Sequence, residues 1–382
     1  MNRKLGQDTS VKFFIVLIGL ILLGITLREL QHIFLPFAIA YVLFFLFSPL
    51  NNFLAKKKFP SVIIVILNLV IILFVSFGSL QILLTSIDQF IQDLPVYFSK
   101  LNLIVRETAV RIGIKDPYFR NFSLEKVIAK LDYTELAGGV FSSAIYLSGA
   151  VLLLIFFFGF IVTGHEAVFN AFRRRYISRK IRPMIKDIET KYLNQDLIAD
   201  EIPVLEEKIE KERHISEIRL ENTVRQITSQ IQKYIISKTA LNLLAAVTIG
   251  LTLYFMGLDF ALIWGVLVFI LNFIPTIGSA IALILPTLMA LVQFGTLGYP
   301  LFIAIVIAII QTLYFNLLEP IVLGRRLGLN PIVILLSVLI WGYIWGVAGM
   351  LLAVPLTAIM KIIFSTSKSP NMKFIVDLMD QD

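Results

Sequence analysis

The sequence contains no cysteine, and only 16% of its 382 residues are charged. The lack of cysteine excludes disulfides, thiolate metal sites and a cysteine nucleophile, and it leaves the redox compartment open. A soluble domain carries about 25% charged residues, so this chain has too few charges to cover a surface that faces water. With 58% hydrophobic residues and a mean hydropathy of +0.85, the composition predicts a polytopic membrane protein in a lipid bilayer.

Signatures of catalysis and of nucleotide binding are also missing. Neither a His-Glu-x-x-His zinc motif nor a Gly-x4-Gly-Lys-Ser/Thr phosphate loop occurs. The three histidines, His32, His165 and His214, fall at expected span ends or in a charged region, away from any buried serine. The net charge is +8, but no basic domain is present, so no nucleic-acid partner is expected. We therefore predict no catalytic residue, no metal, no cofactor and no step driven by ATP.

Long runs without charged residues mark the expected membrane spans. A spanning helix needs about 20 mostly apolar residues to cross the hydrocarbon core. The runs cover residues 13–27, 30–55, 59–87, 136–165, 239–258, 260–318 and 327–360. The first run is not a cleaved signal peptide, because Arg28 and Glu29 follow it without a small-residue cleavage site. The pattern predicts an all-α bundle of about eight spans.

Two of these runs do not divide into whole spans. Residues 260–318 would form a helix of roughly 90 Å, about three hydrocarbon thicknesses, so the segment must turn back on itself. Gly and Pro residues predict breaks at 272–278 and 295–300. Residues 327–360 are too long for one upright span, and their glycine-rich centre predicts a hairpin tip, with a long tilted helix as the alternative. Two broken-helix hairpins would then enter from opposite faces, as in secondary transporters.

The distribution of Lys and Arg predicts the orientation of the chain. Basic clusters before residue 13, at 56–58, at 173–175 and in the tail would all lie on one side, which the positive-inside rule makes cytoplasmic. Both termini are therefore expected in the cytoplasm of a bacterial plasma (inner) membrane. The resulting regions are 1–87 (N-terminal membrane helices), 88–135 (an extracytoplasmic amphipathic segment), 136–165 (a membrane helix), 166–238 (a cytoplasmic helical hairpin), 239–364 (the C-terminal membrane core) and 365–382 (a cytoplasmic tail).

The two extramembrane regions are expected to be helical. Residues 88–135 suit amphipathic helices interrupted at Pro95 and Pro117, either packed on the rim of the bundle or acting as a lid. Residues 166–238 carry apolar side chains at helical spacing, with a stop and restart at residues 200–203, where Pro203 suits a first helical turn. Their apolar stripes pack on each other or on a neighbouring subunit, so a homo-oligomer through membrane and cytoplasmic helices is one expectation.

The carboxylate of Glu319, at the end of a predicted span, is a candidate functional group. Insertion of a charged residue at a helix centre costs about 2.5–3.5 kcal/mol, so Glu319 is expected to face protein or water. It either pairs with Arg325 or Arg326, or it serves as a proton or cation site or a gate latch. A second candidate is Asn272 near Pro275, where a freed carbonyl could bind an ion or a polar solute. Helix packing through the small residues beside it is the alternative.

Three ordered segments, 272–279, 319–331 and 341–357, resemble the autoinducer-2 exporter family of bacterial permeases, and residues 35–41 do so more weakly. The resemblance implies an inner-membrane permease of roughly eight spans, in a family linked to export of autoinducer-2 and to sodium/proton antiport. The candidate pathway residues are Asn272, Pro275, Gly278, Asn316, Glu319 and Pro320. The candidate gating or packing residues are Gly324, Arg325, Arg326, Gly342, Trp345, Gly346, Gly349 and Pro355.

These observations predict a permease that moves a small polar solute across the bacterial plasma membrane without ATP. The substrate path would lie between the two hairpins. A sodium (or other cation)/proton antiporter is the alternative within transport. A membrane scaffold that acts through the cytoplasmic hairpin is the alternative from another class.

Overall fold

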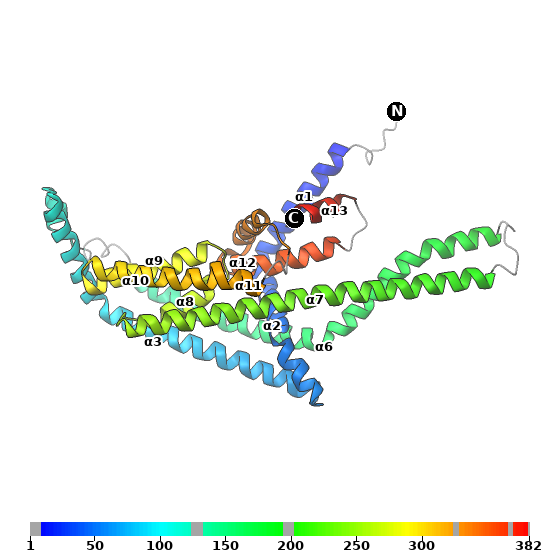
Figure 1. Ribbon diagram of the computed structural model, residues 1–382, viewed down its shortest axis with the longest axis horizontal. Coiled ribbons are helices and arrows are strands. Elements are labelled where there is room, and N and C mark those ends of the chain that lie inside the picture. The colour runs from blue at the N-terminus through cyan, green and yellow to red at the C-terminus, as the bar shows by residue number, and fades with distance from the viewer. Residues whose placement is uncertain (1–8, 124–132, 194–201, 324–327, 366–369, 381–382) are drawn as a thin grey trace.

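The computed structural model describes residues 9–123, 133–193, 202–323, 328–365 and 370–380, which form helices and one isolated β-bridge between Leu329 and Asp380. Figure 1 shows the long helix α7 running the length of the molecule, with α6 beside its projecting end. The helices are α1 (Thr9–Glu29), α2 (Gln31–Lys56), α3 (Ser61–Ile112), α4 (Pro117–Arg120), α6 (Tyr133–Leu193), α7 (Ile202–Phe255), α8 (Ala261–Leu271), α9 (Ile277–Phe294), α10 (Gly298–Gln311), the π-helix η2 (Thr312–Leu318), α11 (Glu319–Leu323), α12 (Pro331–Ser365) and α13 (Pro370–Met379).

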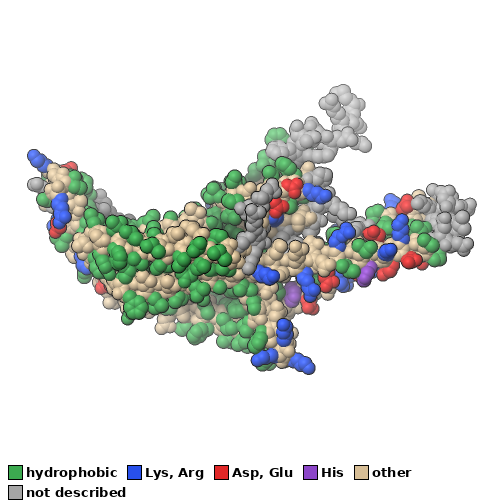
Figure 2. Space-filling view, in the orientation of Figure 1, with side chains coloured by type: hydrophobic (Ala, Val, Ile, Leu, Met, Phe, Trp, Pro, Cys, Tyr) green, Lys and Arg blue, Asp and Glu red, His purple; other side chains and the backbone are tan. Residues whose placement is uncertain are grey.

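The helices have the length and composition of a membrane protein. Among the described residues, seven helical segments are long and apolar enough to span a bilayer, and α8 is a shorter apolar helix. Large apolar side chains cover the outside of the bundle, as on α1, where Phe14, Ile18 and Leu22 are more than half exposed. In Figure 2 hydrophobic side chains dominate the body, whereas charged side chains gather on the projecting arm of α6 and α7. The predicted all-α polytopic bundle is confirmed.

Both long apolar runs contain the expected breaks. The helix α8 ends at Leu271 and α9 begins at Ile277, and a second interruption separates Phe294 of α9 from Gly298 of α10. The helix α12 is broken at Trp345 and Gly346, which have non-helical backbone angles. The chain therefore forms two broken-helix hairpins, α8–α9 and the two arms of α12, rather than continuous helices.

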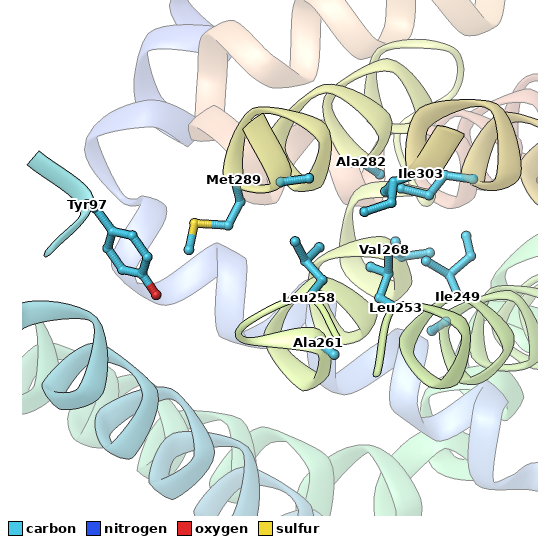
Figure 3. Close-up of a cluster of buried hydrophobic side chains, with 12 residues drawn as sticks. Tyr97, Ile249, Leu253, Leu258, Ala261, Val268, Ala282, Met289 and Ile303 are labelled. Carbon is cyan, nitrogen blue, oxygen red and sulfur yellow. The ribbon is translucent and has the colours of Figure 1, made fainter. Parts of the chain in front are cut away.

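The base of the α8–α9 hairpin lies beside the C-terminal end of α7. The backbone N–H of Asp259 donates to Oε1 of Gln293 (2.8 Å), which joins the start of α8 to the end of α9. Figure 3 shows the buried cluster behind this contact, where α7, α8, α9 and α10 meet through side chains such as Leu253, Val268 and Ile303. The side chain of Tyr97 on α3 joins this cluster and also donates to Asp259 Oδ2 (2.9 Å).

The α12 hairpin packs against α7 nearer to the middle of that helix. Its base packs against Tyr234 through Val354 and Ala358, and Tyr234 lies about 30 Å along the helix from Phe255. Ile274 at the tip of the first hairpin packs with Val338 and Ala353, which lie in the two arms of α12. The two hairpins therefore contact α7 at positions about 30 Å apart, and their entry from opposite faces of the membrane stays a prediction.

Two expectations about the extramembrane regions have different outcomes. The predicted interruption at Pro95 is wrong, because α3 continues through Pro95 to Ile112. A helix can accept an internal proline by losing one hydrogen bond and bending. Pro117 does start a new helix, α4, as predicted.

The hairpin predicted at residues 166–238 is helical and is continuous with the apolar parts of α6 and α7. The helix α7 starts at Ile202, with Pro203 in its first turn. Boundaries at residues 88, 166 and 239 fall within α3, α6 and α7. The division into regions thus follows the expected membrane crossing rather than helix ends, and it stays a prediction.

Candidate functional site

The tip of the α8–α9 hairpin is a tight turn fastened by Asn272. Its amide nitrogen donates to the Val268 carbonyl (2.7 Å), and its amide oxygen accepts from the Ser279 hydroxyl (2.7 Å), so one buried side chain ties both arms. Pro275 accepts from the Ile277 N–H (2.7 Å) around Thr276, whose φ is +65° and ψ −55°. This geometry is a γ-turn of the rare, strained type. Both amide groups of Asn272 are thus bonded within the turn, and its role in a pathway stays a prediction.

Glycines allow the arms of both hairpins to approach closely. A Cβ added at Gly278 would lie 1.7 Å from the Leu271 carbonyl oxygen, and one at Gly349 would lie 1.9 Å from the Trp341 carbonyl oxygen. Gly342 is similarly close to the Met350 side chain, at 2.9 Å. Gly346 has a φ of +61°, a conformation that favours glycine. Gly278 and Gly349 require glycine because the backbone of the other arm lies where a side chain would start.

The junction between α1 and α2 holds the tip of the α12 hairpin. The indole N–H of Trp345 donates to the Leu27 carbonyl (2.9 Å), and the Trp345 side chain is buried. Arg28 donates to the Tyr343 hydroxyl (3.2 Å), and its guanidinium lies 5.1 Å from the centre of the Tyr343 ring. Trp345 thus fastens the tip to the α1–α2 junction, and its predicted part in gating or packing stays a prediction.

A buried ion pair lies beside the hairpins. The Lys238 ammonium on α7 donates to both oxygens of the Glu319 carboxylate, at 2.6 and 2.7 Å. The Lys238 side chain is 5% exposed and that of Glu319 is 23% exposed. Taking two charges out of water costs several kcal/mol per ion, so a buried ion pair adds little to the stability of the fold. Charged groups in such a setting are often found at functional sites, which makes this pair a candidate.

The π-helix η2 positions Glu319. The backbone N–H of Glu319, the residue that follows η2, donates to the Tyr314 carbonyl. This carbonyl lies five residues back, whereas an α-helix would use the carbonyl four residues back. Pro320 lacks an N–H and cannot continue the α-helical ladder, which accounts for an irregular turn just before it. The Tyr314 hydroxyl also shares a hydrogen bond with Thr248 of α7 (2.9 Å). Such single-turn irregularities occur often at functional sites.

A cavity of about 260 Å³ connects the ion pair with both hairpins. Lys238 and Tyr234 line it from α7, Phe273 from the first tip, and Pro355 from the second arm of α12. The remaining lining side chains are Ile39, Val42, Ile235, Ile270, Ala348, Leu351 and Leu352. The cavity lies where a solute between the hairpins would contact a charged group.

The other predicted residues do not all gather here. Asn316 is exposed on η2, and Pro320 is exposed next to Glu319. Gly324, Arg325 and Arg326 lie outside the described residues, so their expected pairing with Glu319 stays a prediction. Within the described part of the chain, no group of three or more His, Asp or Glu side chains could hold a metal ion.

Sequence reasoning missed Lys238 as the partner of Glu319. The available signal was its position, since it is the last charged residue before the uncharged run that continues α7. Asn242, one turn further on, was also missed. It is fully buried and donates to the Phe269 carbonyl (3.3 Å), while its own amide oxygen has no partner among the described residues.

Comparison with known proteins adds an independent line of evidence. The chain matches the description "AI-2E family transporter" over residues 13–198 and 206–369. It is similar to two bacterial proteins that carry the name "Putative transport protein". One is from Borreliella burgdorferi, with 29% identity over 92% of this chain and 86% of that protein. The other is YhhT of Escherichia coli (strain K12), with 25% identity over 96% of this chain and 94% of YhhT.

A third relative is similar over a shorter region. The "AI-2 transport protein TqsA" of Escherichia coli (strain K12) is 37% identical over 139 residues, which are 36% of this chain and 40% of TqsA.

Proposed function

This chain belongs to the AI-2E family of transporters, and from this premise we propose that it moves a small solute between the two hairpins without ATP. The observation that supports the proposal is a cavity that Lys238 lines together with the tip of the first hairpin and the second arm of α12. Broken helices give up backbone hydrogen bonds, which membrane proteins tolerate where the backbone is buried in protein or lines a cavity. A scaffold has no need of such a cavity.

Glu319 is the group that we propose to couple transport to an ion gradient. Its carboxylate binds Lys238 and is more exposed than the ammonium, so it can exchange this partner for a proton or a cation from water. The irregular turn η2 immediately before it provides backbone that can change its hydrogen bonding. In this scheme the ion pair closes the path, and its opening admits the solute.

Cation/proton antiport is a second candidate, favoured by Asn242. Its buried amide oxygen has no donor among the described residues, and such oxygens are suitable ligands for a hard cation. Flux assays with and without sodium distinguish this candidate from solute transport.

The proposal includes the setting of the protein. We place it in a bacterial plasma membrane with both termini in the cytoplasm, because the basic clusters fall on one side of the predicted spans. The helices α6 and α7 project into the cytoplasm in this orientation and offer a surface for a second copy of the chain.

The test is flux of labelled solutes into proteoliposomes with imposed proton or sodium gradients. Glu319→Gln removes the ionisable group and keeps its size, so we expect loss of gradient-driven flux, together with lower thermal stability because the buried Lys238 ammonium loses its partner. Asp380→Asn is the matched control, because it removes the carboxylate that pairs with Lys361, away from the cavity. A Glu319→Gln protein that transports normally with unchanged pH dependence would contradict the coupling role. One that only unfolds at lower temperature would leave Glu319 a structural ion pair.

A further inference from the structure

The cavity at the hairpin tips is lined mainly by apolar side chains. Nine of its eleven lining residues are apolar, and Lys238 is the only charged residue among those that the structure places there. A solute rich in hydroxyl groups would leave some of them without hydrogen bonds, at about 1–3 kcal/mol each. An occupant that fits these walls therefore has an apolar body.

Lys238, which lines the cavity, carries a charge that is suited to an anion. The Lys238 ammonium has three donors and no acceptor, and its two observed hydrogen bonds both go to the Glu319 carboxylate. Lysine is a compact charge on a flexible stem, so it can exchange one carboxylate for another without the fixed orientation that arginine requires.

The difference in burial between the two partners indicates which one moves. The Lys238 side chain is 5% exposed, whereas the Glu319 side chain is 23% exposed and is followed by Pro320 on the outside of α11. An unpaired buried ammonium is strongly unfavourable. The glutamate, in contrast, can turn to water once another anion has taken its place. The lysine then keeps a negative partner throughout.

From these observations we propose that the substrate is a small amphipathic organic anion, whose anionic group replaces Glu319 on Lys238 while its apolar body fills the cavity. This assignment rests on the proposed transport function and names the substrate class for the same path. It narrows the polar solute predicted from the sequence to one with a single anionic end.

The size of the cavity limits the substrate further. Its volume is about 260 Å³, just below the 300–1,000 Å³ that is usual for ligand pockets. A carboxylate on one ring or on a short chain is of this scale. A long-chain fatty acid is too large.

Benzoate is a suitable probe, with benzamide and benzylamine as neutral and cationic molecules of similar shape. Each is titrated into the full-length protein in lipid nanodiscs by isothermal titration calorimetry. We expect benzoate to bind at least about tenfold more tightly than either control, which corresponds to about 1.4 kcal/mol. Equal binding of benzamide and benzoate would overturn the proposal.

Two variants test the exchange at Lys238. Glu319→Gln removes the competing carboxylate, so benzoate should bind at least about tenfold more tightly than to the original protein. The double variant Lys238→Met with Glu319→Gln removes both charges and leaves neither unpaired, so it should fold and lose the preference for benzoate. Asp380→Asn should leave binding unchanged. A double variant that still prefers benzoate, or weaker binding to Glu319→Gln, would refute the exchange.

The experiments distinguish failure of the proposed substrate class from failure of the proposed transport function. If benzoate does not bind but a neutral solute crosses proteoliposomes in a Glu319-dependent way, the substrate class is wrong and the transport proposal stands. If benzoate binds as expected but no solute shows gradient-driven flux, the transport proposal fails and the anion site stands.

Discussion

Replacement of Gly278 by alanine tests the close contact at the first hairpin tip. The added Cβ would lie 1.7 Å from the Leu271 carbonyl oxygen, and real Cβ contacts essentially never fall below 3.0 Å. The two arms must therefore separate by about 1.3 Å, in a region where interiors are close-packed. Overpacking of this kind costs about 1–3 kcal/mol.

The higher helix propensity of alanine opposes this loss of stability and has to be subtracted from it. Gly278 lies in the first turn of α9, where alanine is favoured over glycine by at most about 1 kcal/mol. Since the obstructing atom belongs to the backbone, it cannot rotate away as a side chain would. We expect a net loss of about 1–2 kcal/mol in the free energy of unfolding.

The matched control is Gly159→Ala in α6. No atom lies within 4 Å of its added Cβ, so only the helix preference acts and stability should stay equal or rise slightly. Both variants are compared by thermal unfolding of the purified protein, followed by size-exclusion chromatography. If Gly278→Ala unfolds at the same temperature as Gly159→Ala, the close contact at the tip does not exist and the hairpin geometry described above is wrong.

Three further predictions concern orientation, the cytoplasmic hairpin and the second tip. Single cysteines at Lys57 and Glu210 should resist labelling from outside intact cells, whereas one at Val110 should react; the reverse pattern would invert the topology. Deletion of residues 182–221 should leave flux intact in proteoliposomes, whereas loss of flux would favour a role for the hairpin beyond a scaffold surface. Trp345→Phe removes one buried hydrogen bond and should lower the free energy of unfolding by about 1 kcal/mol, measured by the same thermal assay; an unchanged value would show that the indole bond is not formed.

The breaks in the membrane helices could be predicted because they depend on local chemistry. Pro275 and Gly278 interrupt one apolar run, and Gly346 interrupts another, at positions where span length already required a turn. Helix-period patterns likewise predicted the long α6 and α7. Pro95 shows the limit of such rules, because the surrounding helix accepted it.

The ion pair could not be predicted in the same way, because it joins residues far apart in the sequence. Lys238 and Glu319 are separated by 81 positions, and only the packing of α7 against α11 brings them together. Sequence proximity favoured Arg325 or Arg326 instead. The apolar lining of the cavity is equally a product of packing, since its residues come from α2, α7, α8, α12 and the first hairpin tip.

Because α7 is continuous, a small tilt of this helix would displace its far end by a larger distance. The helix is unbroken from Ile202 to Phe255, and about 54 Å of it lie between Ile202 and Lys238. A tilt of about 5° that pivots near Lys238 displaces the far end by about 5 Å on this geometry. Spin labels near Ile202 would therefore report a tilt of α7 that is too small to follow at Lys238 itself.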